Sequence, residues 1–183
     1  MTDAFTALAR LFDEEGSGEY LGEAVTMEQH MLQTGAAARR AGAAGALVVA
    51  AVVHDVGHFT GVVSGRDLLS GTDNHHDEVA SEWLSRWFGP EVTEPVRLHV
   101  AAKRYLCAVD PSYADQLSEA SRYTMAVQGG PMSPEEADAF ARTAYADDAV
   151  DLRRWDDLGK DPYLPPLHLE DFRDEIETAD RTR

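Results

Sequence analysis

The sequence predicts an all-α protein folded as one helical domain over residues 1–183. Apolar residues recur at helical spacing in most segments, as in Phe5, Leu8 and Leu11, and no stretch alternates convincingly as a half-buried strand would. A chain of 183 residues is long enough to bury a full core. No repeat or low-complexity tract divides it, so we expect a single domain.

Capping signals locate the first two helices. The periodic apolar residues predict a helix over 4–12, which ends before an acidic, glycine-containing loop. Thr26 is a suitable cap for the next helix, and Gln29 stands three residues later at the capping-box position. We expect this second helix to carry His30 and to run to about Arg40.

The central helix is expected over about 46–57, and it ends in His54, Asp55 and, beyond it, His58. In a helix the two histidines share a face one turn apart, and Asp55 lies about 100° round from His54. Burying these groups is costly unless a metal ion pairs with them. The alternative is a buried helix whose His-Asp end is a satisfied polar cap.

A loop follows over 59–74, loosened by glycines, and we interpret it as a candidate lid. An amphipathic helix is expected to begin at His75 or His76 and to end at Gly89-Pro90.

The next helix is expected over 91–102, with Pro95 in its first turn, where proline is tolerated. It brings His99 and Lys103 onto one face at i, i+4. The last helices are expected at 118–127, from Ser133-Pro134-Glu135-Glu136 onward, at 147–158 and, as an acidic C-terminal helix, at 169–179.

The composition excludes several classes of partner. Sixteen basic and 33 acidic residues give a net charge of −17, which argues against nucleic acid and anionic membranes. An anionic substrate would therefore need local positive charge in the site. Cys107 is the single cysteine, no signal peptide is visible, and the apolar run 46–53 is too short for a bilayer. We expect a cytoplasmic protein.

Histidines and acids interrupt several otherwise apolar helix faces, and one shared metal centre explains them with a single cause. Four histidines and two aspartates, without a thiolate, suit two iron or manganese ions bridged by a carboxylate. A single tetrahedral zinc site is less suitable because six ligands exceed its needs. The interrupting residues are His30, His54-Asp55, His76, His99 and Asp156-Asp157.

These motifs resemble the HD-domain superfamily, specifically its mixed-valent di-iron oxygenases and, within them, the PhnZ-type 1-hydroxyphosphonate dioxygenases. The resemblance covers about 20–160. The HD pair alone is a weak signal, whereas the Tyr-x-x-Glu loop and the His-x-x-x-Lys-Arg-Tyr-Leu run are much more specific. The matching segments are Tyr20-Leu21-Gly22-Glu23, His30-Met31-Leu32-Gln33, His54-Asp55-Val56-Gly57-His58, Asn74-His75-His76-Asp77-Glu78, His99-Val100-Ala101-Ala102-Lys103-Arg104-Tyr105-Leu106 and Arg154-Trp155-Asp156-Asp157.

The resemblance implies a set of metal ligands. Asp156 is preferred over Asp157 because it stands four residues before Lys160, as the family's last ligand does, although the doublet leaves this choice open. His76 is preferred over His75, which we interpret as a solvated residue at the helix start. One iron would take His30, His54, Asp55 and Asp156, and the second would take Asp55 as a bridge, His76 and His99.

The resemblance also implies residues that act on the substrate. Lys103 and His58 would bring positive charge to an anionic phosphonate, and Ser121 would donate a hydrogen bond to it. Residues matching Tyr20 and Glu23 gate the iron in the family and contact the substrate amine.

The implied function is an O2-dependent oxygenase with an Fe(II)/Fe(III) pair, which cleaves the C–P bond of a small 1-hydroxyphosphonate. 2-Amino-1-hydroxyethylphosphonate would give glycine and phosphate, and the 2-trimethylammonio analogue would give glycine betaine and phosphate. The alternatives are an HD-domain metal-dependent phosphohydrolase acting on a phosphoester or nucleotide, and a non-enzymatic metal-binding module. We expect a monomer or a small homo-oligomer. The sequence leaves the C2 substituent and the stereochemistry open.

Overall fold

The computed structural model describes residues 2–20, 22–60, 71 and 75–183. Every regular element in these ranges is a helix, and the β pairing there is limited to an isolated bridge between Glu19 and Thr26. The predicted all-α class is therefore confirmed. Within the same ranges, no helix combines the length and apolar character that a membrane span requires.

The first two helices begin where side chains cap them. Helix α1 (Ala4–Glu15) starts after Asp3, whose carboxylate accepts a hydrogen bond from the backbone N–H of Thr6 at 3.0 Å. Helix α2 (Met27–Arg40) starts after Thr26, whose hydroxyl accepts the N–H of Gln29 at 3.1 Å. These contacts satisfy backbone donors that a helix start leaves unpaired. The predicted cap at Thr26 is confirmed, and α1 is three residues longer than expected.

The central helix is shorter than predicted. Helix α3 (Gly45–Val53) ends before His54, and the chain turns there before the single turn of α4 (Gly57–Thr60). The prediction of one helix reaching residue 57 is therefore wrong. His54 and Asp55 lie in the turn between the two helices.

Close backbone packing requires glycine at the start of α4. A Cβ atom on Gly57 would lie 1.9 Å from the carbonyl oxygen of His76, so only glycine allows this approach. His76 opens helix α6 (His76–Leu84), which ends earlier than the predicted boundary at Gly89-Pro90. The candidate lid, predicted over 59–74, lies mostly outside the described residues.

Helix α7 (Pro90–Val109) is longer than the predicted 91–102. Pro90, rather than Pro95, occupies the first turn, and Pro95 lies inside the helix, where it removes one backbone hydrogen bond. The predicted placement of Pro95 is therefore wrong. His99 and Lys103 lie one turn apart on α7, and both are buried.

The following segment contains one helix that the sequence analysis missed. Asp110 caps the short helix α8 (Pro111–Gln116) by accepting backbone N–H groups of Ser112 and Tyr113. The predicted helices follow as α9 (Glu119–Val127), α10 (Pro134–Phe140) and α11 (Ala146–Asp156). The helix start expected at Ser133-Pro134-Glu135-Glu136 is confirmed, and Ser133 and Glu136 form a capping box there.

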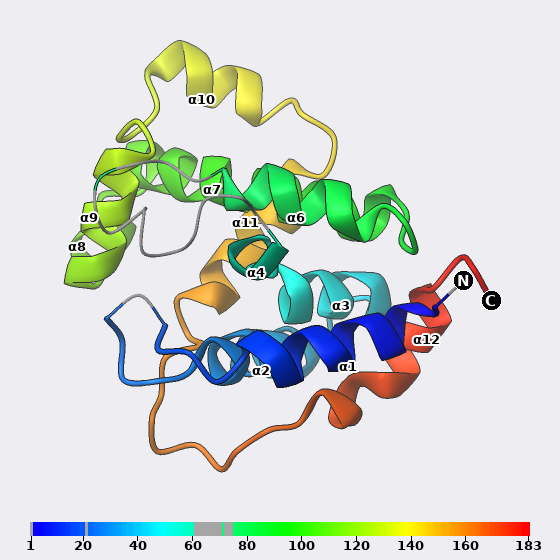
Figure 1. Cartoon of the computed structure of the whole chain (residues 1–183). Coiled ribbons are helices and arrows are strands. Elements are labelled where there is room, and N and C mark those ends of the chain that lie inside the picture. The colour runs from blue at the N-terminus through cyan, green and yellow to red at the C-terminus, as the bar shows by residue number, and fades with distance from the viewer. Residues whose placement is uncertain (1, 21, 61–70, 72–74) are drawn as a thin grey trace.

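The C-terminal segment returns to the start of the chain. The expected helix over 169–179 begins as a 3-10 turn, η1 (Leu169–Phe172), and continues as α12 (Arg173–Ala179). Beyond α12, the carboxylate of Asp180 accepts the backbone N–H of Ala4 at 2.9 Å. The two ends of the chain consequently lie side by side (Figure 1).

Helix α3 is the centre of the core. Its residues 47–53 are all buried, and it packs against α2 on one side and α7 on the other, with α11 and α12 also in contact (Figure 1). Burying apolar surface is the main favourable contribution to folding, so a helix apolar on every side is suited to this position. Its C-terminal end delivers His54 and Asp55 to the interior.

Candidate metal centre

Asp55 lies at the middle of a cluster of four buried histidines. Its Oδ2 atom is 3.6 Å from Nε2 of His30 and 3.4 Å from Nε2 of His54. Its Oδ1 atom is 3.4 Å from Nε2 of His76 and 3.5 Å from Nε2 of His99. The two carboxylate oxygens therefore face two different pairs of imidazoles. All five residues are at most 4% exposed.

Within each pair the imidazole nitrogens face each other. The Nε2 atoms of His30 and His54 are 3.2 Å apart, and those of His76 and His99 are 3.1 Å apart. Ligand atoms at neighbouring positions around one transition-metal ion lie roughly 3 Å apart, because each metal–nitrogen bond is about 2.1 Å. Each pair, together with Asp55, is thus a three-ligand group of the size that one ion needs.

In three of these histidines, the Nδ1 atom lies within hydrogen-bond distance of a backbone carbonyl oxygen. An Nδ1–H that donates to a carbonyl holds the ring so that Nε2 faces Asp55, and Nε2 is then the nitrogen that a metal ion would bind after displacing any proton on it. The Nδ1-to-oxygen distances are 3.0 Å from His30 to Gly159, 2.9 Å from His54 to Ala51 and 2.7 Å from His99 to Val96.

Asp156 joins the first pair, whereas Asp157 does not. Oδ1 of Asp156 is 3.4 Å from Nε2 of His30, and it is buried with no hydrogen bond from any described residue. Its Oδ2 pairs with Arg153. Asp157 instead pairs with Arg153 and accepts the phenol O–H of Tyr113 at 2.6 Å. A buried carboxylate oxygen without a donor is costly unless a cation meets it, so the residues fit a metal ion here.

Burial and the neighbouring charges shift the pKa values of the clustered residues in opposite directions. Burial lowers the pKa of His30 to about 4. Burial also acts to lower the pKa of His54, but the Asp55 carboxylate prevails and raises that pKa to about 9. Burial would raise the pKa of Asp55 itself, but His54 and the other imidazoles hold it well below the usual value. Asp55 therefore stays ionised, as a bridging ligand must.

A small cavity of about 20 Å³ opens beside the cluster. Four residues predicted to act on the substrate or to gate the iron line it: Tyr20, His58, Lys103 and Ser121. Thr124 and Gln128 line it as well, and the sequence analysis missed both. Ser121, Thr124 and Gln128 are spaced i, i+3, i+7 along α9 and its C-cap, and in the sequence such a polar face is typical of an exposed helix surface.

Lys103 supplies positive charge inside this acidic protein. It is 4% exposed, and its ammonium donates to the hydroxyl of Thr124 at 3.2 Å. Burial, with a contribution from Arg153, lowers the pKa of Lys103 to about 7. An anion arriving beside the lysine would favour its charged form. The arrangement is therefore suited to binding an anionic group next to the candidate metal ligands.

Tyr20 and His58 stack on the two pairs of histidines. The Tyr20 ring lies 3.7 Å from the His30 ring at an interplanar angle of 11°, and the His58 ring lies 4.1 Å from His76 at 16°. Burial and the nearby carboxylates raise the pKa of Tyr20 well above its usual value, so its phenol stays protonated. Both predicted residues are thus in contact with predicted ligands.

Glu23 lies just beyond this cavity, in an adjoining one of similar size. Its Oε1 accepts the Ser118 hydroxyl at 2.7 Å and is 3.4 Å from the ammonium of Lys160. His75 is outside the cluster: it is exposed and has a left-handed backbone conformation, with φ of 45°. The choice of His76 over His75 agrees with this geometry.

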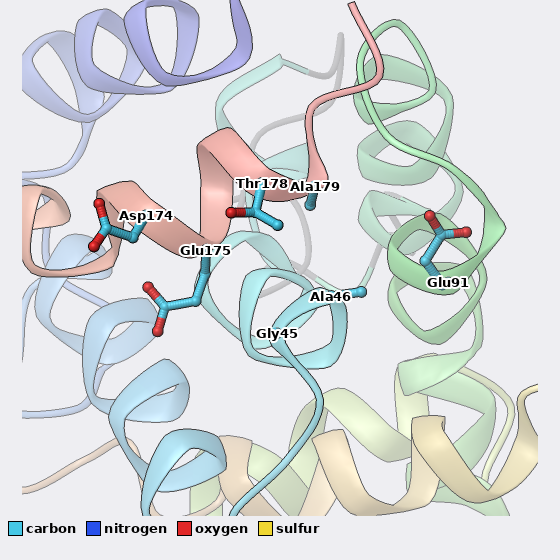
Figure 2. A pocket seen from close by; sticks show the side chains of 7 residues that line it. All are labelled: Gly45, Ala46, Glu91, Asp174, Glu175, Thr178 and Ala179. Carbon is cyan, nitrogen blue, oxygen red and sulfur yellow. The ribbon is translucent and has the colours of Figure 1, made fainter. Parts of the chain in front are cut away.

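A larger cavity, of about 400 Å³, lies at the opposite end of α3 (Figure 2). Three carboxylates from α7 and α12 line it, those of Glu91, Asp174 and Glu175, together with the first residues of α3. None of the predicted site residues contributes to it, so the candidate chemistry belongs to the His-Asp cluster.

Comparison with known proteins places the chain among named enzymes. It is 42% identical over 150 residues to a 1-hydroxy-2-(trimethylamino)ethylphosphonate dioxygenase (glycine-betaine-forming) of Leisingera caerulea, covering 82% of this chain and 76% of that protein. It is 37% identical over 177 residues to a hydroxymethylphosphonate dioxygenase of Gimesia maris, covering 95% and 87%. An uncharacterised protein of Acanthamoeba polyphaga mimivirus is 30% identical over 155 residues, covering 84% and 71%. No protein-family model matches the chain.

Proposed function

This chain belongs to the PhnZ-type 1-hydroxyphosphonate dioxygenases, and from that membership we propose that it uses two iron ions and O2 to oxidise a small 1-hydroxyphosphonate. The enzyme is an oxygenase that cleaves a C–P bond. The observation that carries the two-metal proposal is the position of Asp55, whose two oxygens face separate pairs of histidines.

The proposed ligands divide between two ions. Asp55 would be shared between them, because its carboxylate offers one oxygen to each side. The first ion would be held by His30, His54, Asp55 and Asp156, and the second by Asp55, His76 and His99. When bound, the iron pair supplies the site at which O2 takes up electrons from C1 of the substrate.

The overall reaction balances without a further reductant. A C–H bond and the C–P bond of C1 break, and both atoms of O2 enter the products. One hydroxyphosphonate and one O2 thus give one carboxylic acid and one phosphate. The four electrons that reduce O2 come from C1, which rises from the alcohol to the carboxylate level. The protein has to bind the phosphonate, orient C1 and limit the access of water.

Lys103, His58 and Ser121 are the proposed phosphonate-binding residues. All three line the cavity beside the cluster, and Lys103 provides a buried cation within a chain of net charge −17. A phosphonate is a fixed anion with three acceptor oxygens, and charge-assisted hydrogen bonds to it are among the stronger ones in proteins. Tyr20 covers the His30 side of the cavity and is proposed to gate the first ion.

The substrate candidates differ at C2. The relatives' names point to the 2-trimethylammonio compound and to hydroxymethylphosphonate, which lacks C2. The 2-amino compound is a third candidate. Their carboxylate products would be glycine betaine, formate and glycine. Glu23 lines the cavity that adjoins the proposed phosphonate site, so its carboxylate is the proposed partner of a cationic substituent.

The test is phosphate release from the three hydroxyphosphonates by iron-loaded protein in air and under argon. We expect phosphate to be released in air and not under argon, with one O2 consumed per phosphate. The neighbouring aspartates offer a matched pair: Asp156→Asn is expected to lose iron and turnover, whereas Asp157→Asn is expected to keep its iron. Phosphate release that continues under argon, or activity on nucleotides without oxygen, would favour a phosphohydrolase and overturn the proposal.

A further inference from the structure

Lys160 connects the loop that carries Tyr20 and Glu23 to the wall of the cavity. Its ammonium lies 3.4 Å from Oε1 of Glu23 and donates to the Ser121 hydroxyl at 2.9 Å. It also lies 5.9 Å above the Tyr20 ring. Lys160 is only 14% exposed at its side chain, and Glu23 is 20% exposed. This partly buried ion pair is therefore screened by solvent less than one at the surface.

The ion pair lies beside the place where a substituent at C2 would extend. Two small cavities, each of about 20 Å³, share Tyr20, Ser121 and Thr124 as a common wall. The first contains the candidate phosphonate-binding residues, and Glu23 and Lys160 line the second. A substrate whose phosphonate binds in the first cavity therefore extends its far end toward Glu23.

This geometry makes Lys160 a competitor of cationic substrates. A substrate ammonium has to replace the Lys160 ammonium at Glu23 or share the carboxylate with it, and two cations close together repel each other. A substrate without a cation leaves the pair intact. This inference rests on the proposed function. We propose that Lys160 pairs with Glu23 when no substrate is bound, and that this pairing lowers the preference of the site for hydroxyphosphonates with a cationic C2 group.

Lys160 also orients Ser121, and this second contact affects all substrates alike. Because the ammonium donates to the Ser121 oxygen, it occupies a lone pair there and leaves the hydroxyl hydrogen free to donate to another group, such as a bound phosphonate. Loss of Lys160 should therefore weaken phosphonate binding in general. Only the ratio of the dissociation constants of a neutral and a cationic ligand isolates the competition at Glu23.

The experiment measures dissociation constants by calorimetry, with protein loaded with Fe(II) under argon so that no turnover occurs. The ligands are hydroxymethylphosphonate, which is neutral apart from its phosphonate, and 2-amino-1-hydroxyethylphosphonate. In Lys160→Met we expect the preference for the amino compound to rise about tenfold, and in Lys160→Arg to stay within about twofold of the unmodified protein.

Arg154 provides a matched control. Its guanidinium is 3.4 Å from Asp110 and 5.9 Å above the Tyr113 ring, which repeats the distances around Lys160 at a more exposed position, in α11, six residues earlier in the chain. Arg154→Met is expected to leave the ratio unchanged. Glu23→Gln should weaken the amino compound alone, and adding Lys160→Met to that variant should change the ratio less than Lys160→Met does in the unmodified protein.

The outcomes separate this inference from the proposed function. If the unmodified protein binds neither hydroxyphosphonate, the proposed function fails, and the inference fails with it. If it binds them and Lys160→Met weakens both equally, or leaves the ratio unchanged, only the competition is overturned. If Lys160→Met does not fold, the Glu23→Gln result decides: a ratio unchanged by that substitution also overturns the inference.

Discussion

Replacing Gly57 with alanine is the perturbation whose effect follows most directly from the structure. The added Cβ atom would lie 1.9 Å from the carbonyl oxygen and 2.7 Å from the carbonyl carbon of His76. Both are backbone atoms, so no change of side-chain rotamer relieves the clash. Ordinary contact begins at 3.4 Å, so α6 must move away from α4 by about 1.5 Å.

This displacement acts on the second group of ligands and spares the first. Nε2 of His76 is 3.4 Å from Oδ1 of Asp55, and a 1.5 Å retreat would bring the separation to about 5 Å. Two ligands of one ion lie at most about 4.2 Å apart when each bond is about 2.1 Å. The group of His30, His54 and Asp156 does not depend on α6. We therefore expect one ion per chain instead of two.

The same clash should lower stability. Overpacking costs about 1–3 kcal/mol, and we expect the upper end because a backbone has to move. For a chain of this size, about 3 kcal/mol corresponds to a fall in Tm of roughly 6–12 °C. Metal per chain, measured by atomic emission after dialysis, and thermal unfolding followed by circular dichroism are the assays.

Gly45→Ala is the control for this experiment, because a Cβ there meets its nearest neighbour, Cγ of Glu175, at 3.9 Å. Gly45 opens α3, so alanine should leave the metal content unchanged and Tm equal or slightly higher. Two ions per chain with an unchanged Tm in Gly57→Ala would refute the reasoning about α6.

Three further predictions concern single residues. His54→Ala and Asp55→Ala are expected to abolish both iron loading and turnover, since each removes a central ligand; retention of iron in either variant, measured by atomic emission, would contradict the ligand assignment. Lys103→Ala is expected to keep its iron and to raise KM about 10- to 150-fold through loss of a charged hydrogen bond, and steady-state kinetics showing an unchanged KM would argue against the phosphonate contact. Hydrogen bonds from Ala4 and Thr182 outweigh burial and lower the pKa of Asp180, so its stabilisation is present above the unfolded pKa of about 3.9 and is lost as pH falls through the lower folded value. Asp180→Asn should therefore cost about 1 kcal/mol at pH 7 in urea unfolding, with the difference shrinking below about pH 4; a cost independent of pH would exclude this explanation.

The parts of the fold that local chemistry determines are the ones that the sequence predicts well. Thr26 and Ser133 cap their helices as expected because a capping side chain bonds to its own backbone two or three residues on. The end of the central helix was mispredicted, and the chain beyond it packs Gly57 against α6, a contact between segments distant in sequence. The run of apolar residues before His54 carries no sign of that contact.

The same distinction applies to the candidate site. His30, His76 and His99 were predictable as a group because each interrupts an apolar helix face. Burying a histidine there without a partner would cost free energy, so a shared partner was expected. Thr124 and Gln128 were missed because threonine and glutamine on an amphipathic helix resemble ordinary surface residues. Their burial follows from the packing of α9 near Lys103, which the sequence alone does not reveal. Asp156 and Asp157 were separable only once the direction of each side chain was known.

The central claim is that Asp55 bridges two metal ions, and anomalous X-ray diffraction at the iron absorption edge tests it most directly. Crystals of protein produced in iron-rich medium should give two strong peaks, one between Oδ2 of Asp55 and the pair His30 and His54, and one between Oδ1 and the pair His76 and His99. A single peak, or iron located away from Asp55, would contradict the account.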